Sequence, residues 1–364
     1  MLMKIAQHIL ISIFAGIWAL TSFSAPVQVQ EQKVVEKEVL LPLLKIESDF
    51  DAYAYPMTLV GETVYYAVDY LVPQSNDVKK SEIYAQRIDG DEHEVIYSAE
   101  FDASEAGGIS ELNASKDCLF FVEVNASWII YGLDIETKET FVVRDSAQSK
   151  QQSPPSIQVI DEHVYWFETD EDGASVLYKY NMESKEVTNV SSDVPFYLAS
   201  PYKVIPASEK DIFYLTKDAE SVFLNRLSDG NEVPHTIDTT LDSVELVAVS
   251  DKYAFFANRA LDPALYLMKL DTGNVAVVLD EVEIGSVRSA VIVDDLVLID
   301  LSIGNHTAVF QWQVGSQTIL QIADEAAWLR KTGDGKIIGV MPDSDIDPEK
   351  HIAGMRIIEL GNDR

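Results

Sequence analysis

Apolar and polar positions recur in the same order along most of this 364-residue chain. The unit is an apolar residue, an aromatic residue, three variable residues, another apolar residue and a polar turn, as between Leu265 and Gly273. The same frame fits six other places, and its second positions follow one another at steps of 47, 47, 45, 43, 44 and 46 residues. Steps of this length are typical of the blades of a β-propeller. The second positions, called markers below, are Tyr84, Tyr131, Tyr178, Phe223, Tyr266, Phe310 and Arg356.

A short apolar run precedes each marker, for example Val64-Tyr65-Tyr66 and Leu119-Phe120-Phe121. These runs are too short and too aromatic for helices, and their unbroken apolar character indicates strands that are buried on both faces. A more polar segment follows each marker, as at 140–143, and indicates an outer strand. With a further candidate strand ahead of the apolar run, as at 156–160, each unit predicts four antiparallel strands.

We therefore predict an all-β fold, a seven-bladed β-propeller of four-stranded antiparallel blades whose ring is closed by an N-terminal strand. The seventh unit stops at Arg364, where its outer strand would begin. We expect residues 37–43 to pair with the strand around Met355 to Leu360, because an unpaired edge invites aggregation. The predicted boundaries are a signal peptide at 1–24 and a single domain at 25–364, with residues 26–32 as a flexible lead, blades near 50–100, 101–145, 156–191, 203–238, 243–280, 288–322 and 327–364, and a closing strand at 33–44.

The repeats resemble those of extracytoplasmic propellers of the TolB-like and YWTD (LDL-receptor) type, including related bacterial domains of unknown function. The best matches are Val64-Tyr65-Tyr66 leading into 83–90, and Val164-Tyr165-Trp166 leading into Leu177-Tyr178. The matched positions are core aromatics and turn residues, so the resemblance implies a fold and no reactive site. The Thr-Asp half of the YWTD pattern is mostly missing, and no counterpart of the N-terminal α/β domain of TolB-like proteins is found.

The first 24 residues have the pattern of a secretory signal peptide. Lys4 precedes an apolar stretch at 5–20, and the small residues Ser22 and Ser24 fit cleavage after Ser24. An uncleaved membrane anchor is the alternative, but this stretch is shorter than the roughly 20 residues that span a bilayer. The sequence therefore predicts a periplasmic or secreted protein with no membrane span after cleavage. Because Cys118 is the only cysteine, no intramolecular disulfide can form.

The chain carries 27 lysines and arginines against 60 aspartates and glutamates, a formal net charge of −33. This balance excludes binding to nucleic acid or to an anionic membrane surface by charge, and favours a basic partner or a cation. No nucleophile elbow or phosphate-binding loop is present. The histidines after the signal show no metal-ligand spacing, so structural or surface roles are favoured and no cofactor is expected apart from calcium. They are His93, His163, His235, His306 and His351.

Acidic residues gather in the predicted loops between each apolar run and its marker strand. Equivalent loops of a propeller emerge on the same face, so we expect an acidic rim there. The alternate carboxylates of Asp343, Asp345 and Asp347 suggest an irregular calcium site, with plain solvated acid as the alternative; Pro348 and Gly354 exclude an EF-hand. The candidate binding residues are Asp69, Asp77, Glu168, Asp170, Asp172, Asp343, Asp345 and Asp347.

The two longest of these loops, at 69–80 and 342–352, belong to units that would be neighbours in a closed ring. We interpret their shared edge as the preferred binding surface. The expected function is that of a non-catalytic, monomeric scaffold in the cell envelope that binds an envelope or secreted protein or a small exported ligand. Two alternatives remain: a propeller enzyme, such as a glycan lyase or hydrolase with its site at the central channel, and a calcium-dependent binding module.

Overall fold

The computed structural model describes three parts of the chain: residues 28–31, residues 36–42 and, with gaps, residues 51–358. The gaps fall mainly on connections between strands. The predicted signal peptide also lies outside the described residues. No helix among the described residues is both long and apolar enough to span a bilayer. The gaps are at 73–74, 76, 91, 103–106, 150–152, 170–173, 196–210, 218–221, 229–230, 238–243, 259–263, 280–283, 304–305, 317, 324–327, 333–335 and 342–351.

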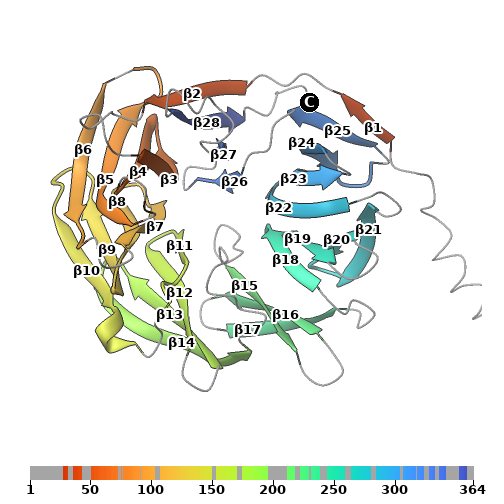
Figure 1. The fold of residues 1–364 in the computed structure, drawn as a ribbon. Coiled ribbons are helices and arrows are strands. Elements are labelled where there is room, and N and C mark those ends of the chain that lie inside the picture. Colours follow the sequence, from red (N-terminus) through yellow and green to blue (C-terminus); the bar gives the residue numbers. More distant parts are fainter. Residues whose placement is uncertain are drawn as a thin grey trace, which may run out of the picture.

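The described residues form β-strands in small sheets arranged around a centre, as in a β-propeller (Figure 1). A short 3₁₀ helix at Ser146–Gln148 is the one helical element described. Five sheets have four strands. They are β3 (Asp51–Val60), β4 (Thr63–Leu71), β5 (Val78–Arg87) and β6 (His93–Glu100); β7 (Gly107–Ala114), β8 (Cys118–Asn125), β9 (Ser127–Asp134) and β10 (Thr140–Asp145); β11 (Ile157–Ile160), β12 (His163–Thr169), β13 (Ala174–Asn181) and β14 (Glu186–Pro195); β18 (Val244–Val249), β19 (Tyr253–Asn258), β20 (Ala264–Lys269) and β21 (Asn274–Leu279); and β26 (Trp328–Lys331), β27 (Ile337–Met341), β28 (Ile352–Ile358) and β2 (Glu36–Pro42).

The prediction of seven four-stranded blades is wrong, because only these five have that form. Another sheet has five strands: β22 (Ile284–Val293), β23 (Leu296–Ile303), β24 (His306–Gln313), β25 (Thr318–Ala323) and β1 (Gln28–Glu31). The last has three described strands: β15 (Ile212–Lys217), β16 (Val222–Ser228) and β17 (Asn231–Ile237). The first difference arises because residues 28–31 add to a sheet, although the sequence suggested a flexible lead there. The second arises because the stretch just ahead of β15, at 196–210, lies outside the described residues.

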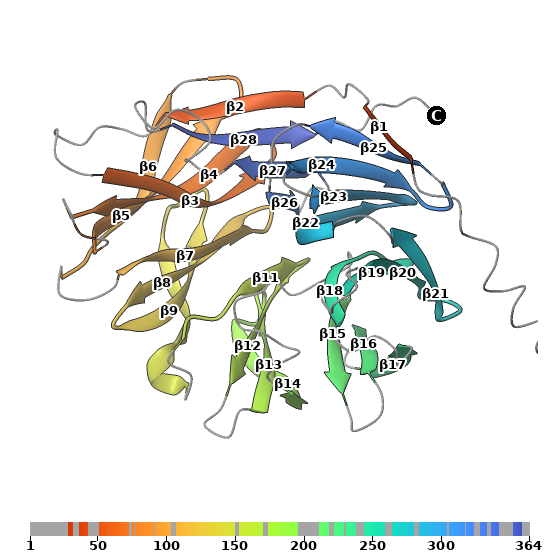
Figure 2. The ribbon, with the colours of Figure 1, turned by 45° about the vertical axis from the view of Figure 1, so that its right-hand side comes forward.

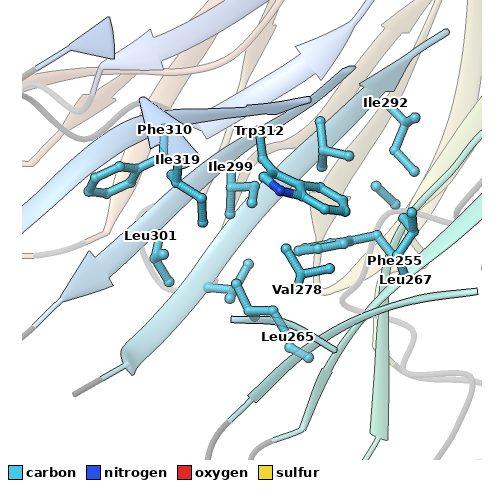
Figure 3. Close-up of a cluster of buried hydrophobic side chains, with 14 of the residues drawn as sticks. Phe255, Leu265, Leu267, Val278, Ile292, Ile299, Leu301, Phe310, Trp312 and Ile319 are labelled. Atoms are coloured by element: carbon cyan, nitrogen blue, oxygen red, sulfur yellow. The ribbon is translucent and has the colours of Figure 1, made fainter. Parts of the chain in front are cut away.

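The core consists of clusters of buried apolar side chains between consecutive sheets. The largest cluster joins the β18–β21 and β22–β25 sheets, where Phe255 and Val278 face Ile292, Ile299 and Trp312 (Figure 3). The ring continues from the last sheet to the first, because Ile338 of β27 and Ile357 of β28 pack with residues of β3–β5. Each sheet is therefore covered on both faces, which explains the unbroken apolar runs of the middle strands.

The predicted closing strand is confirmed. β2 pairs antiparallel with β28, from Glu36 opposite Ile358 to Pro42 opposite Ile352. A second attachment was not predicted: β1 pairs in parallel with β25, from Gln28 opposite Thr318 to Glu31 opposite Gln321. The N-terminal segment therefore covers the outer edges of two neighbouring sheets (Figure 2).

A β-bulge recurs at the same place in five outer strands. In the first sheet Ile83 pairs with Tyr97 and the marker Tyr84 pairs with Val95, so Ile96 is the extra residue. A bulge of this kind bends the strand and redirects the side chains beside it. Every extra residue is a β-branched aliphatic residue that packs into a cluster between sheets, namely Ile96, Val143, Val190, Val278 and Ile322.

Candidate functional site

The structure places Asp69 inside a strand rather than in a rim loop. It lies near the end of β4, where its carboxylate accepts hydrogen bonds from the Ser81 hydroxyl and from the backbone N–H of Ile109 at 3.4 Å. Ile109 belongs to β7, the innermost strand of the next sheet. Asp69 therefore joins two sheets.

The surroundings of Asp69 disfavour a negative charge. Burial raises the pKa of Asp69 to about 7, although the hydrogen bonds from Ser81 and Ile109 act in the opposite direction. Gly108 packs against this carboxylate: a Cβ at that position would lie 2.8 Å from Asp69 Oδ2, and the backbone φ of +139° is one that other residues rarely adopt. Asp69 is thus enclosed by the neighbouring sheet.

Glu168, another predicted rim residue, is also buried within the molecule. Arg144 of β10 donates from Nε to Glu168 Oε1 at 2.8 Å and from Nη2 to Oε2 at 3.0 Å. The indole N–H of Trp166 donates to the same Oε1 at 2.8 Å. The guanidinium also lies over the ring of Tyr178, 4.9 Å from its centroid. A bidentate ion pair thus links the β7–β10 and β11–β14 sheets.

Two further acids, Glu123 and Asp300, are buried or bonded within strands. Glu123 of β8 accepts a hydrogen bond from the hydroxyl of Tyr97, which lies on the outer strand β6 of the preceding sheet. Asp300 of β23 is fully buried and pairs with Arg288 of β22, with Nε 3.0 Å from Oδ2. Burial raises the pKa of Asp300 to about 6, against the opposing effect of Arg288. Both carboxylates are engaged in contacts within the protein and contribute little to an exposed rim.

Among the predicted rim acids that the structure describes, Asp77 alone is exposed and lies in a loop. Its Oδ2 accepts a hydrogen bond from Ser75 Oγ at 2.5 Å, and its backbone N–H donates to the same hydroxyl at 3.0 Å. The other predicted binding residues lie outside the described residues, so the acidic rim and the calcium site remain predictions. They are Asp170, Asp172, Asp343, Asp345 and Asp347.

The described histidines do not gather at one place. His163 at the start of β12 lies 3.1 Å from Asn181 Nδ2, and His93 at the start of β6 packs against Tyr84. His306 begins a third strand of its sheet and His163 a second strand, so the two lie at opposite ends of their sheets. Among the described residues, no group of three histidine, cysteine, aspartate or glutamate side chains could hold a metal ion. His351 lies outside the described residues.

A polar site that the sequence did not predict lies on the innermost strands. Glu111 of β7 accepts a hydrogen bond from Ser156 Oγ at 3.0 Å through Oε1. Its Oε2 and the Oγ of neighbouring Ser110 are inaccessible to solvent and have no hydrogen-bond partner among the described residues. Burial raises the pKa of Glu111, and Ser156 and Arg330 act in the opposite direction. The structure therefore leaves a buried acceptor of β7 without a donor among the described residues.

Arg330, whose charge acts against the rise in the pKa of Glu111, belongs to β26, on the opposite side of the first sheet from β7. Both strands line the inside of the ring (Figure 1). Trp328 stands two residues before Arg330 on the same face of β26, while Leu329 points the other way into a core cluster. With 43% of its surface exposed, Trp328 differs from the buried Trp128, Trp166 and Trp312.

The sequence held a signal for this site. Glu111 interrupts a strand with apolar Ile109 and Leu112 beside it, and β26 combines Trp328 with two basic residues in a strongly acidic chain. The sequence repeat covers the middle strands, whose aromatic residues recur regularly. The innermost strands are less regular, so the repeat does not predict their polar residues.

Comparison with known proteins supports the fold. No family model matches the chain, and no curated protein matches it in sequence. The propeller domain of the trilobed protease of Pyrococcus furiosus, described as having an open velcro topology, is 17% identical with a TM-score of 0.57 over 79% of this chain and 91% of that chain. Oligogalacturonate lyase from Vibrio parahaemolyticus is 10% identical, with a TM-score of 0.58 over 90% and 98%. YCF48, in a structure with D1 peptide bound, is 10% identical, with a TM-score of 0.56 over 93% and 100%.

The chain also spans about half the length of acylaminoacyl peptidase from Pyrococcus horikoshii, 49% of that chain. Identities this low show the fold alone: the protein is an all-β β-propeller. Propellers of this shape occur in peptidases and in a lyase, so the fold is compatible with an enzyme. Membership of the TolB-like or YWTD families stays a prediction.

Proposed function

We propose that this protein is an exported, non-catalytic binding module of the cell envelope, which holds a partner protein or a small exported ligand at the inner strands of its propeller. One observation carries the proposal: Glu111 has one oxygen bonded to Ser156 and a second, buried oxygen without a donor. A buried polar atom of this kind costs free energy unless a water or a ligand satisfies it. The rest of the scaffold is cross-linked by bonds between sheets, which suits a rigid binding surface.

The outer rim has a secondary place in this proposal. Asp69, Glu123, Glu168 and Asp300 are occupied by contacts within the protein. Exposed Asp77 and the undescribed acids of the neighbouring loops would add contacts with a basic partner. The net charge of −33 would speed the approach of such a partner and make its association rate fall with added salt.

The test is affinity capture from the native envelope with three forms of the mature chain: wild type, Glu111→Gln and Glu183→Gln. Gln at position 111 keeps the shape and the bond to Ser156 but removes the charge. The matched control is exposed Glu183, which lies on the turn between β13 and β14 of the next sheet. A component retained by wild type and E183Q but lost by E111Q supports the proposal. Equal recovery by all three forms contradicts it, provided that thermal melts show E111Q to be folded.

A propeller enzyme is the second candidate, favoured by the similarity in fold to a lyase and to the propeller of a protease. Glu111 would then be the group to act on a substrate. Turnover of a glycan or peptide by wild type that E111Q abolishes would favour this candidate, whereas binding without turnover favours the scaffold.

A further inference from the structure

The outer edge of one sheet already binds an extended segment. β1 pairs in parallel with residues 318–321 of β25, and this pairing ends just before Ile322, the extra residue of the bulge. Only Val29 of Gln28–Glu31 is apolar, so the attachment depends mainly on pairing between main chains. An outer strand of this propeller therefore accepts a further strand up to its bulge.

Strand β21 has an equivalent edge. Val277 of β21 and Gln321 of β25 both lie opposite the marker of their sheet, and an extra residue follows each of them, so residues 274–277 correspond to residues 318–321. Each of the four is more exposed than its counterpart beside β1, and Val277 exposes 46% of its surface. Among the described residues, no strand pairs with the outer side of β21, so the place that β1 takes on β25 is open here.

The composition of β21 separates it from the other open outer strands. Charged residues and prolines in an edge strand oppose pairing with another chain. Each of β6, β10, β14 and β17 contains at least one acidic residue, and β14 and β17 contain a proline as well. β21 has the sequence Asn-Val-Ala-Val-Val-Leu, with neither. Because β1 covers β25 and β2 covers β28, β21 is the one outer edge among the described strands that is neither covered nor charged.

The chemistry of an added strand follows from the side chains and from the charge. Val275 and Val277 lie on the same face of β21, where β-branched side chains of a neighbouring strand would cover them. The net charge of −33 attracts a basic segment and opposes pairing with a second copy of the chain. An extended segment with β-branched residues at its centre and basic residues at its ends meets both conditions.

We propose that the outer edge of β21 binds such a segment of a partner protein as a fifth strand of its sheet. Strand addition of this kind takes its affinity from main-chain hydrogen bonds and its specificity from alternate side chains. The edge is separate from Glu111, which lies on the innermost strand of another sheet. The inference therefore goes beyond the proposed function and does not depend on it.

Peptide arrays test the proposal on the mature chain. The probes are nonapeptides with a Lys-Arg pair at each end and five central positions drawn from Thr, Val, Ile and Gln; matched arrays carry Glu pairs at the ends or a central proline. Val277→Lys places a charge on the edge, and Val142→Lys is the matched control, because Val142 has the equivalent place on β10 and is 57% exposed. We expect the basic-ended peptides with alternate β-branched residues to bind, with a Kd at least tenfold weaker in V277K and less than twofold changed in V142K.

Hydrogen exchange on wild type gives a second measurement that needs no variant. The bound peptide should slow exchange of the amides at 274–277 and leave those at 140–142 unchanged. Equal slowing at both places, or equal losses in V277K and V142K, would show attraction by overall charge and overturn the proposal.

The remaining outcomes also overturn it, each in its own way. A preference for Glu-ended peptides rejects the basic partner, and undiminished binding of the proline peptides rejects strand addition. If no peptide binds, self-association in sedimentation that V277K abolishes makes the occupant a second copy, whereas a monomer shows that the edge takes no strand. Glu111→Gln should bind the peptides as wild type does, so failure here leaves the proposed function standing.

Discussion

Arg144 and Glu168 form a bidentate ion pair between two neighbouring sheets, with 13% and 6% of their side chains exposed. Removing one partner of such a pair leaves an uncompensated buried charge. We expect Arg144→Ala to lower the free energy of unfolding by about 3 kcal/mol, as measured by urea denaturation. The double variant Arg144→Met with Glu168→Leu should recover much of this loss, because it leaves no lone charge.

The control for this prediction is the exposed pair of Lys138 and Glu94, whose side chains are 41% and 61% exposed. Lys138→Ala should cost less than about 1 kcal/mol, because solvent screens such pairs. Equal losses from R144A and K138A would show that the buried pair does not hold the sheets together.

The extra residue Val143 is expected to stabilise the contact between the β7–β10 and β11–β14 sheets. Val143→Ala removes apolar contacts from a cluster between sheets and should cost about 2 kcal/mol. Deleting Val143 removes the same contacts and the bulge but leaves Arg144 opposite Ile130, so the deletion should cost at least as much as V143A. Deletion of Gln151, between β10 and β11, is the control; a similar loss from both deletions would contradict a role for Val143.

Asp69 should make the protein less stable as the pH rises toward neutrality. Its pKa in the folded state is about 7, above its ordinary value of 3.8, so the folded protein keeps a proton that the unfolded chain releases. The resulting stabilisation is fully present below about pH 4 and is lost as the pH rises through 7, at about 1.4 kcal/mol per pH unit in between. In Asp69→Asn this component is absent. The difference in unfolding free energy between wild type and D69N should therefore fall from pH 4.5 to pH 7.5.

Ser81→Ala gives an independent check on Asp69. The Ser81 hydroxyl donates to the Asp69 carboxylate and lowers its pKa, so its removal should raise that pKa further. NMR titration of the Asp69 carboxyl carbon measures both forms. An Asp69 pKa near 4 in wild type would contradict the enclosed position of this residue.

Removal of the closing strand should destabilise the protein more than removal of the first strand. β2 pairs with β28 over seven residues, and β1 pairs with β25 over four in a parallel ladder. Deletion of residues 33–44 should lower the Tm sharply and promote aggregation, because it exposes the edge of β28. Deletion of residues 26–32 should give a smaller decrease. An unchanged melt for the first deletion would show that β2 does not close the ring.

Calcium binding at Asp343, Asp345 and Asp347 remains a proposal. If these carboxylates hold the ion, millimolar calcium should raise the Tm, and the triple Asp→Asn variant should lose the increase. Magnesium at the same concentration is the control for general screening. No increase with calcium would remove the calcium-dependent module from consideration.

The sequence predicted the propeller because its middle strands are buried on both faces and therefore have a regular apolar and aromatic pattern. Tyr66 and Trp166 occupy equivalent places beside the markers Tyr84 and Tyr178, and both pairs of rings are stacked. Strand β1 escaped prediction because Gln28–Glu31 has little apolar content and is attached only at an outer edge. Bulges have no signature beyond one more β-branched residue in an outer strand.

The candidate site was predicted less well, because a charged residue near the end of a strand has the same appearance in sequence whether it faces solvent or a neighbouring sheet. β4 extends to Leu71 and β12 to Thr169, beyond the apolar runs, so Asp69 and Glu168 lie within sheets and not in loops. Their partners, Ile109 and Arg144, belong to other units of the repeat. Only the packing of one sheet against the next brings such pairs together.

The pairing of β2 with β28 also determines when the protein can finish folding. Residues 36–42 contact residues 352–358, so closure must wait until nearly the whole chain has been synthesised. Contacts between such distant segments slow folding, because a long loop must close before they form. Until then both β28 and β2 have open edges, and a chain released early would carry them into solution. The position of this one strand therefore makes the last step of folding depend on completion of the whole chain.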